Sequence, residues 1–175
     1  MPRTNPAASK AKMNSGQLVK PLRVMLLGAT GTAGQAALAA LLRRGHDITC
    51  IVRARPDGEQ TQSDCFKADT FAKAEFRIAD VTRLESLRES GFRNEPFDAV
   101  VSCLASRTGA SGDAWAIDYQ ANANALQIAR DLGIRHMVLL SAICVQKPKL
   151  AFQYAKLHHS TLSALHRTRT TSQNQ

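Results

Sequence analysis

The sequence predicts an α/β fold in which parallel strands, ordered 3-2-1-4-5, form a doubly wound sheet with helices on both faces. Short apolar segments rich in β-branched residues alternate along the chain with longer segments of helical periodicity. A glycine-rich turn joins the first apolar segment to the first helical segment. The chain has 175 residues, of which 44% are hydrophobic, so it is long enough for one domain with a core.

The first half of the chain supplies two strands and the helix between them. Arg23–Gly28 is a short apolar run closed by a glycine, and Thr32–Arg44 follows with helical periodicity. Gly45 stands where a helix C-terminus favours glycine. Ile48–Arg53 is β-branched and strand-like, and the polar residues 54–74 are expected to form a loop.

The second half of the chain repeats this alternation. Asp80 is expected to cap the helix after the third strand, and Gly133 to end the helix that follows the fourth. The expected elements are a strand over Glu75–Ala79, a helix over 81–90, a strand over Phe97–Leu104, a helix over Asp113–Leu132, a strand over His136–Ala142 and a helix over 149–165. Crossover helices connect parallel strands, so this order of elements predicts the doubly wound sheet.

Composition argues against several functional classes. The formal net charge is +9, but no basic stripe interleaves with the 5% of aromatic residues, so nucleic acid is not expected as a partner. No apolar run approaches the roughly 18 residues of a membrane span, so no integral membrane segment is expected. The four cysteines form no CxxC pair, which predicts reduced thiols in a reducing compartment and no metal site.

The glycine-rich turn predicts a Rossmann-type dinucleotide site. Gly28 permits a tight turn after the strand, Gly31 lets the backbone approach a pyrophosphate, and Gly34 lets helix and strand pack closely. The N-terminus of the following helix offers N–H groups and a positive dipole end to phosphate. The spacing is GxxGxxG, which resembles that of short-chain dehydrogenases and NmrA-like proteins. A glycine-rich turn without a ligand is the alternative.

The end of the second strand favours NADPH over NADH. NAD-binding proteins hold the ribose 2′-hydroxyl with an acidic residue at this position, but here the segment contains Arg53 and Arg55 and no acid. A guanidinium can form charge-assisted hydrogen bonds with a 2′-phosphate. Asp80, after the third strand, is expected to contact adenine as well as to cap its helix. Solvated strand-end charges are the alternative for the arginines.

The last expected helix, over 149–165, contains one half of a catalytic pair. Related dehydrogenases place Tyr and Lys four residues apart, so that the lysine lowers the pKa of the tyrosine. Lys156 stands in the right frame, but the residue four positions before it is Phe152, and Tyr154 is only two away. This spacing disfavours carbonyl reduction with a tyrosine acid, whereas reduction of a conjugated C=C bond does not require it. A surface lysine and a core phenylalanine are the alternatives.

Three further segments are similar to a narrower family. Cys103–Arg107 (CLASR), Ile117–Ala121 (IDYQA) and Leu140–Pro148 (LSAICVQKP) resemble the divinyl chlorophyllide 8-vinyl reductases, as does Phe152–Leu157 (FQYAKL). These are NADPH-dependent atypical short-chain dehydrogenases that reduce the 8-vinyl group of divinyl (proto)chlorophyllide to ethyl. The resemblance therefore implies NADPH as cofactor and a tetrapyrrole as small-molecule substrate.

The resemblance also implies roles for individual residues. Lys156 is expected to lie by the nicotinamide ribose as the catalytic residue. The residues expected to bind cofactor or to line its cleft are Gly28, Thr30, Gly31, Gly34, Arg53, Asp80, Cys103, Ala105 and Ser141. Ordinary packing at strand ends is the alternative for Cys103, Ala105 and Ser141.

The family-like part is expected to end at Leu157. We expect residues 1–20 to be a disordered basic arm, 21–157 the NADP-binding Rossmann domain, and 158–175 a polar tail unlike the family. Family members continue with further strands, so the sheet is expected to be incomplete at its C-terminal edge and the chain inactive alone. A bacterial cytoplasm is the expected compartment, with the plastid as the alternative.

The sequence leaves two other functional hypotheses open. One is a different NmrA-like or atypical short-chain dehydrogenase, either a reductase or an epimerase. The other is a redox sensor that binds NADP without catalysis. The Leu140–Pro148 segment favours the vinyl reductase over both.

Overall fold

The computed structural model describes residues 20–54, 72–108 and 110–140. Its strands are β1 (Arg23–Leu27), β2 (Asp47–Val52), β3 (Glu75–Ile78), β4 (Ala99–Ser102) and β5 (His136–Leu139). Its helical elements are α1 (Thr32–Arg43), α3 (Leu84–Ser86), η2 (Leu87–Phe92), α4 (Ser111–Ala114), η3 (Trp115–Gln120) and α5 (Ala121–Asp131). The strands form one parallel sheet in the order β3-β2-β1-β4-β5, which confirms the predicted order.

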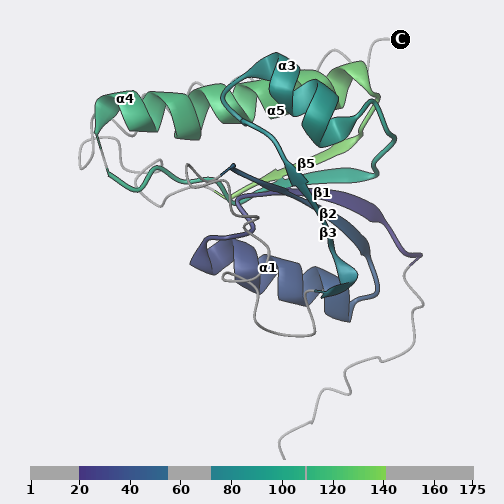
Figure 1. Cartoon of the computed structure of the whole chain (residues 1–175). Helices are drawn as coiled ribbons and strands as arrows, with labels where there is room; N and C mark the ends of the chain where they lie inside the picture. Colours follow the sequence, from purple (N-terminus) through teal and green to yellow (C-terminus); the bar gives the residue numbers. More distant parts are fainter. Residues whose placement is uncertain (1–19, 55–71, 109, 141–175) are drawn as a thin grey trace, which may run out of the picture.

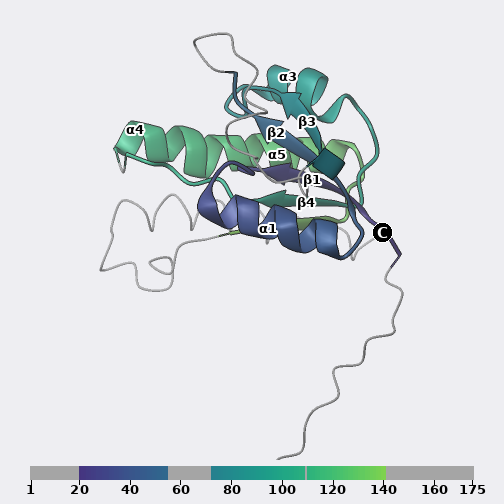
Figure 2. The same ribbon diagram turned by 60° about the horizontal axis from the view of Figure 1, so that its bottom comes forward.

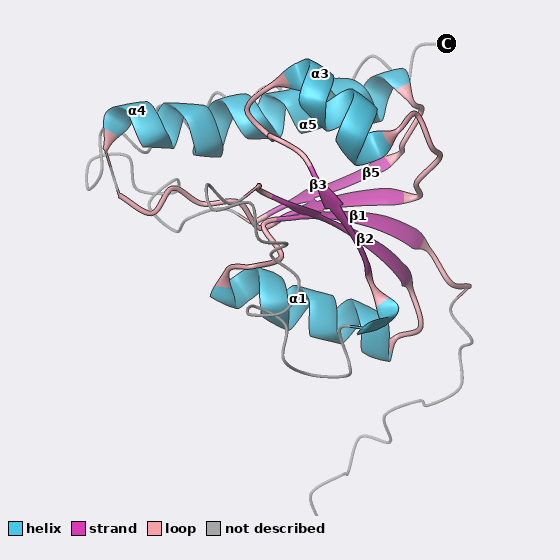
Figure 3. Cartoon of the chain, viewed as in Figure 1, coloured by secondary structure: helices cyan, strands magenta, loops and turns pink. Residues whose placement is uncertain are grey.

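Helices cover both faces of the sheet. Helix α1 lies on one face, and α3, α4 and α5 lie on the other (Figure 1). Figure 3, in the same view, shows the strands as a single layer between these two helical layers. The predicted doubly wound α/β fold is therefore confirmed.

Two hydrophobic cores follow from the alternation of side chains along β1. Val24 and Leu26 pack with Leu38 of α1 on one face, and Met25 and Leu27 belong to the core of the other face. Successive strand residues point to opposite faces, so a strand covered on both sides is apolar throughout. Burying both faces stabilises the fold through the hydrophobic effect and fixes the strand register.

The strand register brings all carboxyl ends to one edge of the sheet. Leu27, the last residue of β1, pairs with Ile51 of β2 and with Ser102 of β4. The turn from β1 to α1 therefore lies beside the segments that leave β2 and β4. Figure 2 shows this edge at the end of the sheet where α1 begins.

The segment after β3 differs from the prediction. Helical structure begins at Leu84 with Arg83 at its N-cap, so the predicted cap at Asp80 is wrong. Asp80 Oδ1 instead accepts hydrogen bonds from the N–H of Thr82 (2.9 Å) and from its hydroxyl (2.7 Å). A carboxylate that bonds the N–H two residues on closes an Asx turn, which delays the helix by several residues.

Several other predicted boundaries shift. The fourth strand was expected over Phe97–Leu104, but β4 is ladder-paired only where β1 provides partners, at Ala99–Ser102. The helix expected from Asp113 begins at Ser111. Its middle turn, η3, is π-helical, which the 3.6-residue periodicity did not reveal. The helix expected over 149–165 lies outside the described residues.

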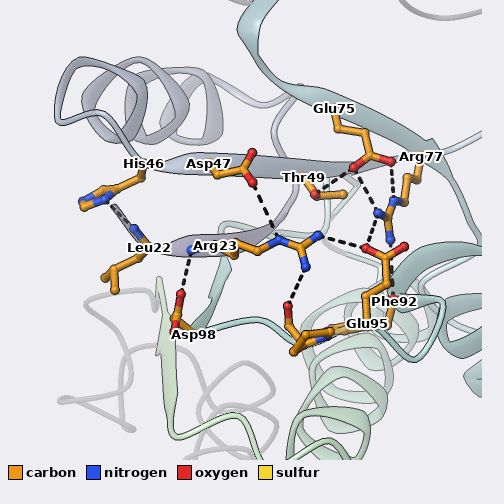
Figure 4. A network of polar contacts seen from close by, with 11 residues as sticks. Leu22, Arg23, His46, Asp47, Thr49, Glu75, Arg77, Phe92, Glu95 and Asp98 are labelled. Carbon is orange, nitrogen blue, oxygen red and sulfur yellow. Dashed lines mark hydrogen bonds and ion pairs between the residues drawn. The ribbon is translucent and has the colours of Figure 1, made fainter. Parts of the chain in front are cut away.

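A network of charged side chains joins the amino ends of the strands (Figure 4). Arg77 of β3 is 3% exposed and contacts Glu75 (2.7 Å, Nε to Oε1) and Glu95 (2.9 Å, Nη2 to Oε2). Arg23 of β1 contacts the same Glu95 at 2.9 Å. The Arg77 guanidinium holds the pKa values of Glu75 and Glu95 below their usual range. The network therefore joins β1, β3 and the segment before β4 at the edge opposite the glycine turn.

Candidate dinucleotide-binding site

The turn after β1 is shaped by Gly28. Its φ of 78° lies in the left-handed region that side chains disfavour. A Cβ atom there would also lie 2.7 Å from the carbonyl oxygen of Cys103, which follows β4. Two independent features of the protein therefore require glycine at this position.

Gly34 is required by the packing of α1. A Cβ atom at Gly34 would lie 2.0 Å from the carbonyl oxygen of Gly28. No side chain fits between the first turn of the helix and the end of β1, as predicted for close packing of helix and strand.

Nothing among the described residues requires glycine at position 31. Its φ is −77°, which any residue adopts, and the nearest heavy atom to an added Cβ is the Gly28 carbonyl oxygen at 3.6 Å. Gly31 and its neighbours Thr30 and Thr32 are exposed. The space that a side chain would fill is open, as expected where a ligand lies against the protein backbone.

The N-terminus of α1 is suited to an anion. Gly31 is the N-cap of the helix, no side chain caps it, and the first turn holds no acidic residue. The first helical hydrogen bond runs from the backbone N–H of Gln35 to the Gly31 carbonyl (2.8 Å). The side-chain Nε2 of Gln35 donates to the Thr30 carbonyl (3.2 Å). Unpaired N–H groups and the positive dipole end of a helix bind phosphate.

Cys103 lies against the Gly28 turn, and Ala105 follows two residues later in the same segment. Cys103 N–H donates to the Leu27 carbonyl (2.9 Å), which fixes the segment after β4 against β1. Cys103 is half-buried, and burial raises the pKa of its thiol, whereas Ala105 is exposed. The structure therefore brings Gly28 and Cys103 together at one edge.

Arg53 and Asp80 follow the two adjacent strands β2 and β3, which are paired up to Val52 and Ile78. Both side chains are exposed at the carboxyl edge. The Thr108 hydroxyl is the main cause that lowers the pKa of Asp113, and the charge of Arg53 contributes. The charge of Arg53 therefore acts on a carboxylate of α4 (Ser111–Ala114). Ser141 and Lys156 lie outside the described residues, so their roles stay predictions.

Sequence reasoning missed two buried polar residues on the helix above β4. Asp118 and Asn122 are 2% and 1% exposed, and they hydrogen-bond Ser106 and Ser102. A signal was present, because the two polar residues are four apart on one helix face, and the next residues on that face, Ala121 and Ala125, are apolar.

Comparison with known families agrees with this geometry. A model of the NAD(P)H-binding family matches residues 28–173, starting at the first glycine of the turn. The chain belongs to the NAD(P)H-binding family. The match runs past Leu157, and the boundary predicted there stays a prediction, since the structure does not describe that part of the chain.

Plant proteins named divinyl chlorophyllide a 8-vinyl-reductase, chloroplastic, are similar to the chain. The protein of Oryza sativa subsp. indica is 41% identical over 87% of this chain and 38% of its own length. That of Zea mays is 44% identical over 77% of this chain and 33% of its own length. The chain thus spans between a third and two fifths of these relatives.

Solved structures of NAD-dependent enzymes share the fold. A Bacillus halodurans protein assigned as an NAD-dependent epimerase/dehydratase has a TM-score of 0.65 at 17% identity, covering 83% of this chain and 65% of its own. The Bordetella bronchiseptica enzyme WbmG, in complex with NAD and UDP, has a TM-score of 0.56 at 18% identity over 69% and 37%. These likenesses confirm the Rossmann-type fold of the family.

Proposed function

We propose that this chain provides the NADPH-binding part of a divinyl chlorophyllide 8-vinyl reductase. The observation that carries the proposal is the identity of 41–44% with four plant proteins of that name, extending over 77–87% of the chain. The open space at Gly31 and the uncapped N-terminus of α1 fit a dinucleotide pyrophosphate.

The residues of the chain would hold the cofactor at the carboxyl edge of the sheet. Gly28 and Gly31 would leave room for the pyrophosphate, and Cys103 would form part of the opposite wall. Arg53 would attract the 2′-phosphate, which favours NADPH over NADH. When bound, NADPH supplies a hydride for one vinyl carbon of the tetrapyrrole. The other vinyl carbon takes a proton, so that the C=C bond becomes an ethyl group.

The similarity to these relatives also suggests a substrate, a role for Lys156 and a cellular compartment. A tetrapyrrole substrate fits their names, and the proposed role of Lys156 is to hold the nicotinamide ribose. Among the described residues, no helix is long and apolar enough to cross a membrane. The chloroplastic names of the relatives favour the plastid over the bacterial cytoplasm as the compartment.

A chimaera tests the proposal directly. Residues 20–157 would replace the matching part of the rice reductase, and the chimaera would be incubated with NADPH and divinyl chlorophyllide. We expect conversion to the monovinyl product, which is monitored by the blue shift of the Soret band. The matched control is the same chimaera with Gly31→Val, which should fold and remain inactive. A folded chimaera that binds NADPH but leaves divinyl chlorophyllide unchanged contradicts the vinyl-reductase proposal and favours the sensor alternative.

A further inference from the structure

The segment that follows β4 is held by a buried carboxylate from the helix above it. Asp118 lies in η3, the π-helical turn between α4 and α5, and is 2% exposed. Its Oδ1 accepts a hydrogen bond from Ser106 N–H at 2.8 Å, and its Oδ2 accepts one from the Ser106 hydroxyl at 2.9 Å. Both carboxylate oxygens thus bind a single residue of the segment, which fixes its position and its orientation.

A second contact holds the other end of the same segment. Asn122, one turn further along the helix, is 1% exposed, and its Oδ1 accepts a hydrogen bond from the Ser102 hydroxyl at 2.6 Å. Ser102 and Ser106 therefore bracket Cys103 and Ala105, the two residues of this segment expected to line the cofactor cleft.

The Asn122 side chain also stabilises the π-helical turn. Asn122 Nδ2 donates hydrogen bonds to the carbonyl oxygens of Asp118 (3.0 Å) and Ile117 (3.4 Å). A π turn disrupts the regular i→i−4 pattern, and such turns are frequent at functional sites. Asn122 therefore bonds both the wider turn that carries Asp118 and the end of β4.

The clamped segment has little freedom relative to the glycine turn. An added Cβ at Gly28 would lie 2.7 Å from Cys103 O and 3.0 Å from Leu104 N, so the two backbones are already in close contact. A small displacement of the segment would either close the space beside the turn or open a gap.

We infer that Asp118 is a positioning residue of the nucleotide cleft, which acts by fixing the segment Ser102–Ser106 against the Gly28 turn. The inference rests on the proposed NADPH site and assigns its geometry to a residue that does not itself touch the nucleotide. Asn122 assists by holding the other end of the segment and the π-helical turn.

The test compares nucleotide affinity and local order in variants of the full chain. Asp118→Ala removes both acceptors, and we expect it to weaken NADPH binding by about tenfold or more, because the Ser106 contacts are lost. Asp118→Asn can accept from Ser106 N–H and donate to the Ser106 hydroxyl, so its affinity should stay within about threefold of the parent. Asp118→Leu removes the acceptors without leaving a cavity and serves if the alanine cavity prevents folding.

Hydrogen exchange distinguishes positioning from general stability. In Asp118→Ala, amides of the peptide covering residues 102–108 should exchange faster, whereas those of β1 and α1 should keep parental rates. The matched control is Asp131→Ala, which removes a carboxylate from the far end of the same helix, where it contacts Arg88. It should change neither the affinity nor the exchange of that peptide.

The outcomes separate this inference from the proposed function. If the parent chain does not bind NADPH, the proposed function fails, and exchange still reports whether Asp118 holds the segment. If the parent binds, then folded alanine or leucine variants with parental affinity overturn the inference. It is also overturned if Asp118→Asn loses as much affinity as Asp118→Ala, or if neither apolar variant folds, since Asp118 is then a purely structural residue.

Discussion

A Cβ atom at Gly34 would lie 2.0 Å from the carbonyl oxygen of Gly28, so helix α1 can approach the end of β1 only without a side chain between them. Gly31, midway between the two, meets no such obstacle, because the nearest atom to its Cβ would be 3.6 Å away. Two glycines that look equivalent in the sequence motif are therefore required for different reasons. Gly34 serves the fold, and the proposed reason for Gly31 is the ligand.

Valine substitutions should separate these two roles. Gly31→Val should fold with a parental circular dichroism spectrum and bind no NADPH, because the side chain occupies the proposed pyrophosphate position. Gly34→Val should lose more than about 3 kcal/mol of folding stability, because the clash is with backbone and cannot be relieved by a rotamer change. Urea denaturation and NADPH fluorescence titration measure the two effects. Parental NADPH affinity in Gly31→Val would show that the turn is not the phosphate site.

Charge reversal at Arg53 should invert the preference for NADPH. Arg53→Glu replaces an attraction for the 2′-phosphate with a repulsion and should cost about 2–4 kcal/mol of NADPH affinity, with little change for NADH. Isothermal titration with both nucleotides measures the difference. Arg43→Glu, at the exposed C-terminal end of α1, is the control for net charge. Equal affinity of the parent for both nucleotides would refute the assigned preference.

Acid should weaken the charged network at the amino ends of the strands. Arg77 lowers the pKa values of Glu75 and Glu95 in the folded chain, so folding favours their ionised forms. This contribution to stability is complete above the unfolded pKa of about 4.3 and is lost as pH falls through the lower folded values.

Urea midpoints at pH 7 and pH 3.5 measure this contribution. The parent should lose stability on acidification, and Glu95→Gln should lose less of it, because one of the titrating partners of Arg77 is gone. Both carboxylates are partly exposed, so the effect should be modest. An unchanged acid dependence in Glu95→Gln would mean that other carboxylates dominate.

The two cysteines of the described residues should differ in reactivity. Burial raises the pKa of the Cys50 thiol to about 12, so very little thiolate is present at pH 8, and the side chain is inaccessible within β2. Cys103 is half-buried at the proposed cleft, and its pKa is also raised by burial.

Alkylation with iodoacetamide followed by peptide mass spectrometry tests this difference. Cys103 should be modified slowly in the folded chain, and NADPH should slow it further. Cys50 should be modified only after denaturation. Modification of Cys50 at the rate of Cys103 under native conditions would contradict the packing of β2.

The sequence alone determined the parallel sheet, its strand order and the location of the glycine turn. The residues after the first in β1 and β2, Val24–Leu27 and Ile48–Val52, are buried, and their largely apolar character shows in the sequence. The glycines predict the turn from a short stretch of sequence, because the conformation of a turn depends mainly on residues close together in the chain. The resemblance to 8-vinyl reductases that the Leu140–Pro148 segment indicated agrees with the overall identity of 41% to the rice protein of that name.

Only the tertiary structure decided which residues hold this edge together. Asp118 and Ser106 are twelve residues apart, and their contact depends on a π-helical turn that the 3.6-residue periodicity does not predict. Asp80 was expected to cap a helix, but its carboxylate bonds Thr82, since local side-chain acceptors compete with helix initiation. Hydrogen bonds between segments distant in sequence depend on how helix and strand are placed in space, and a linear pattern of residue types does not encode that placement.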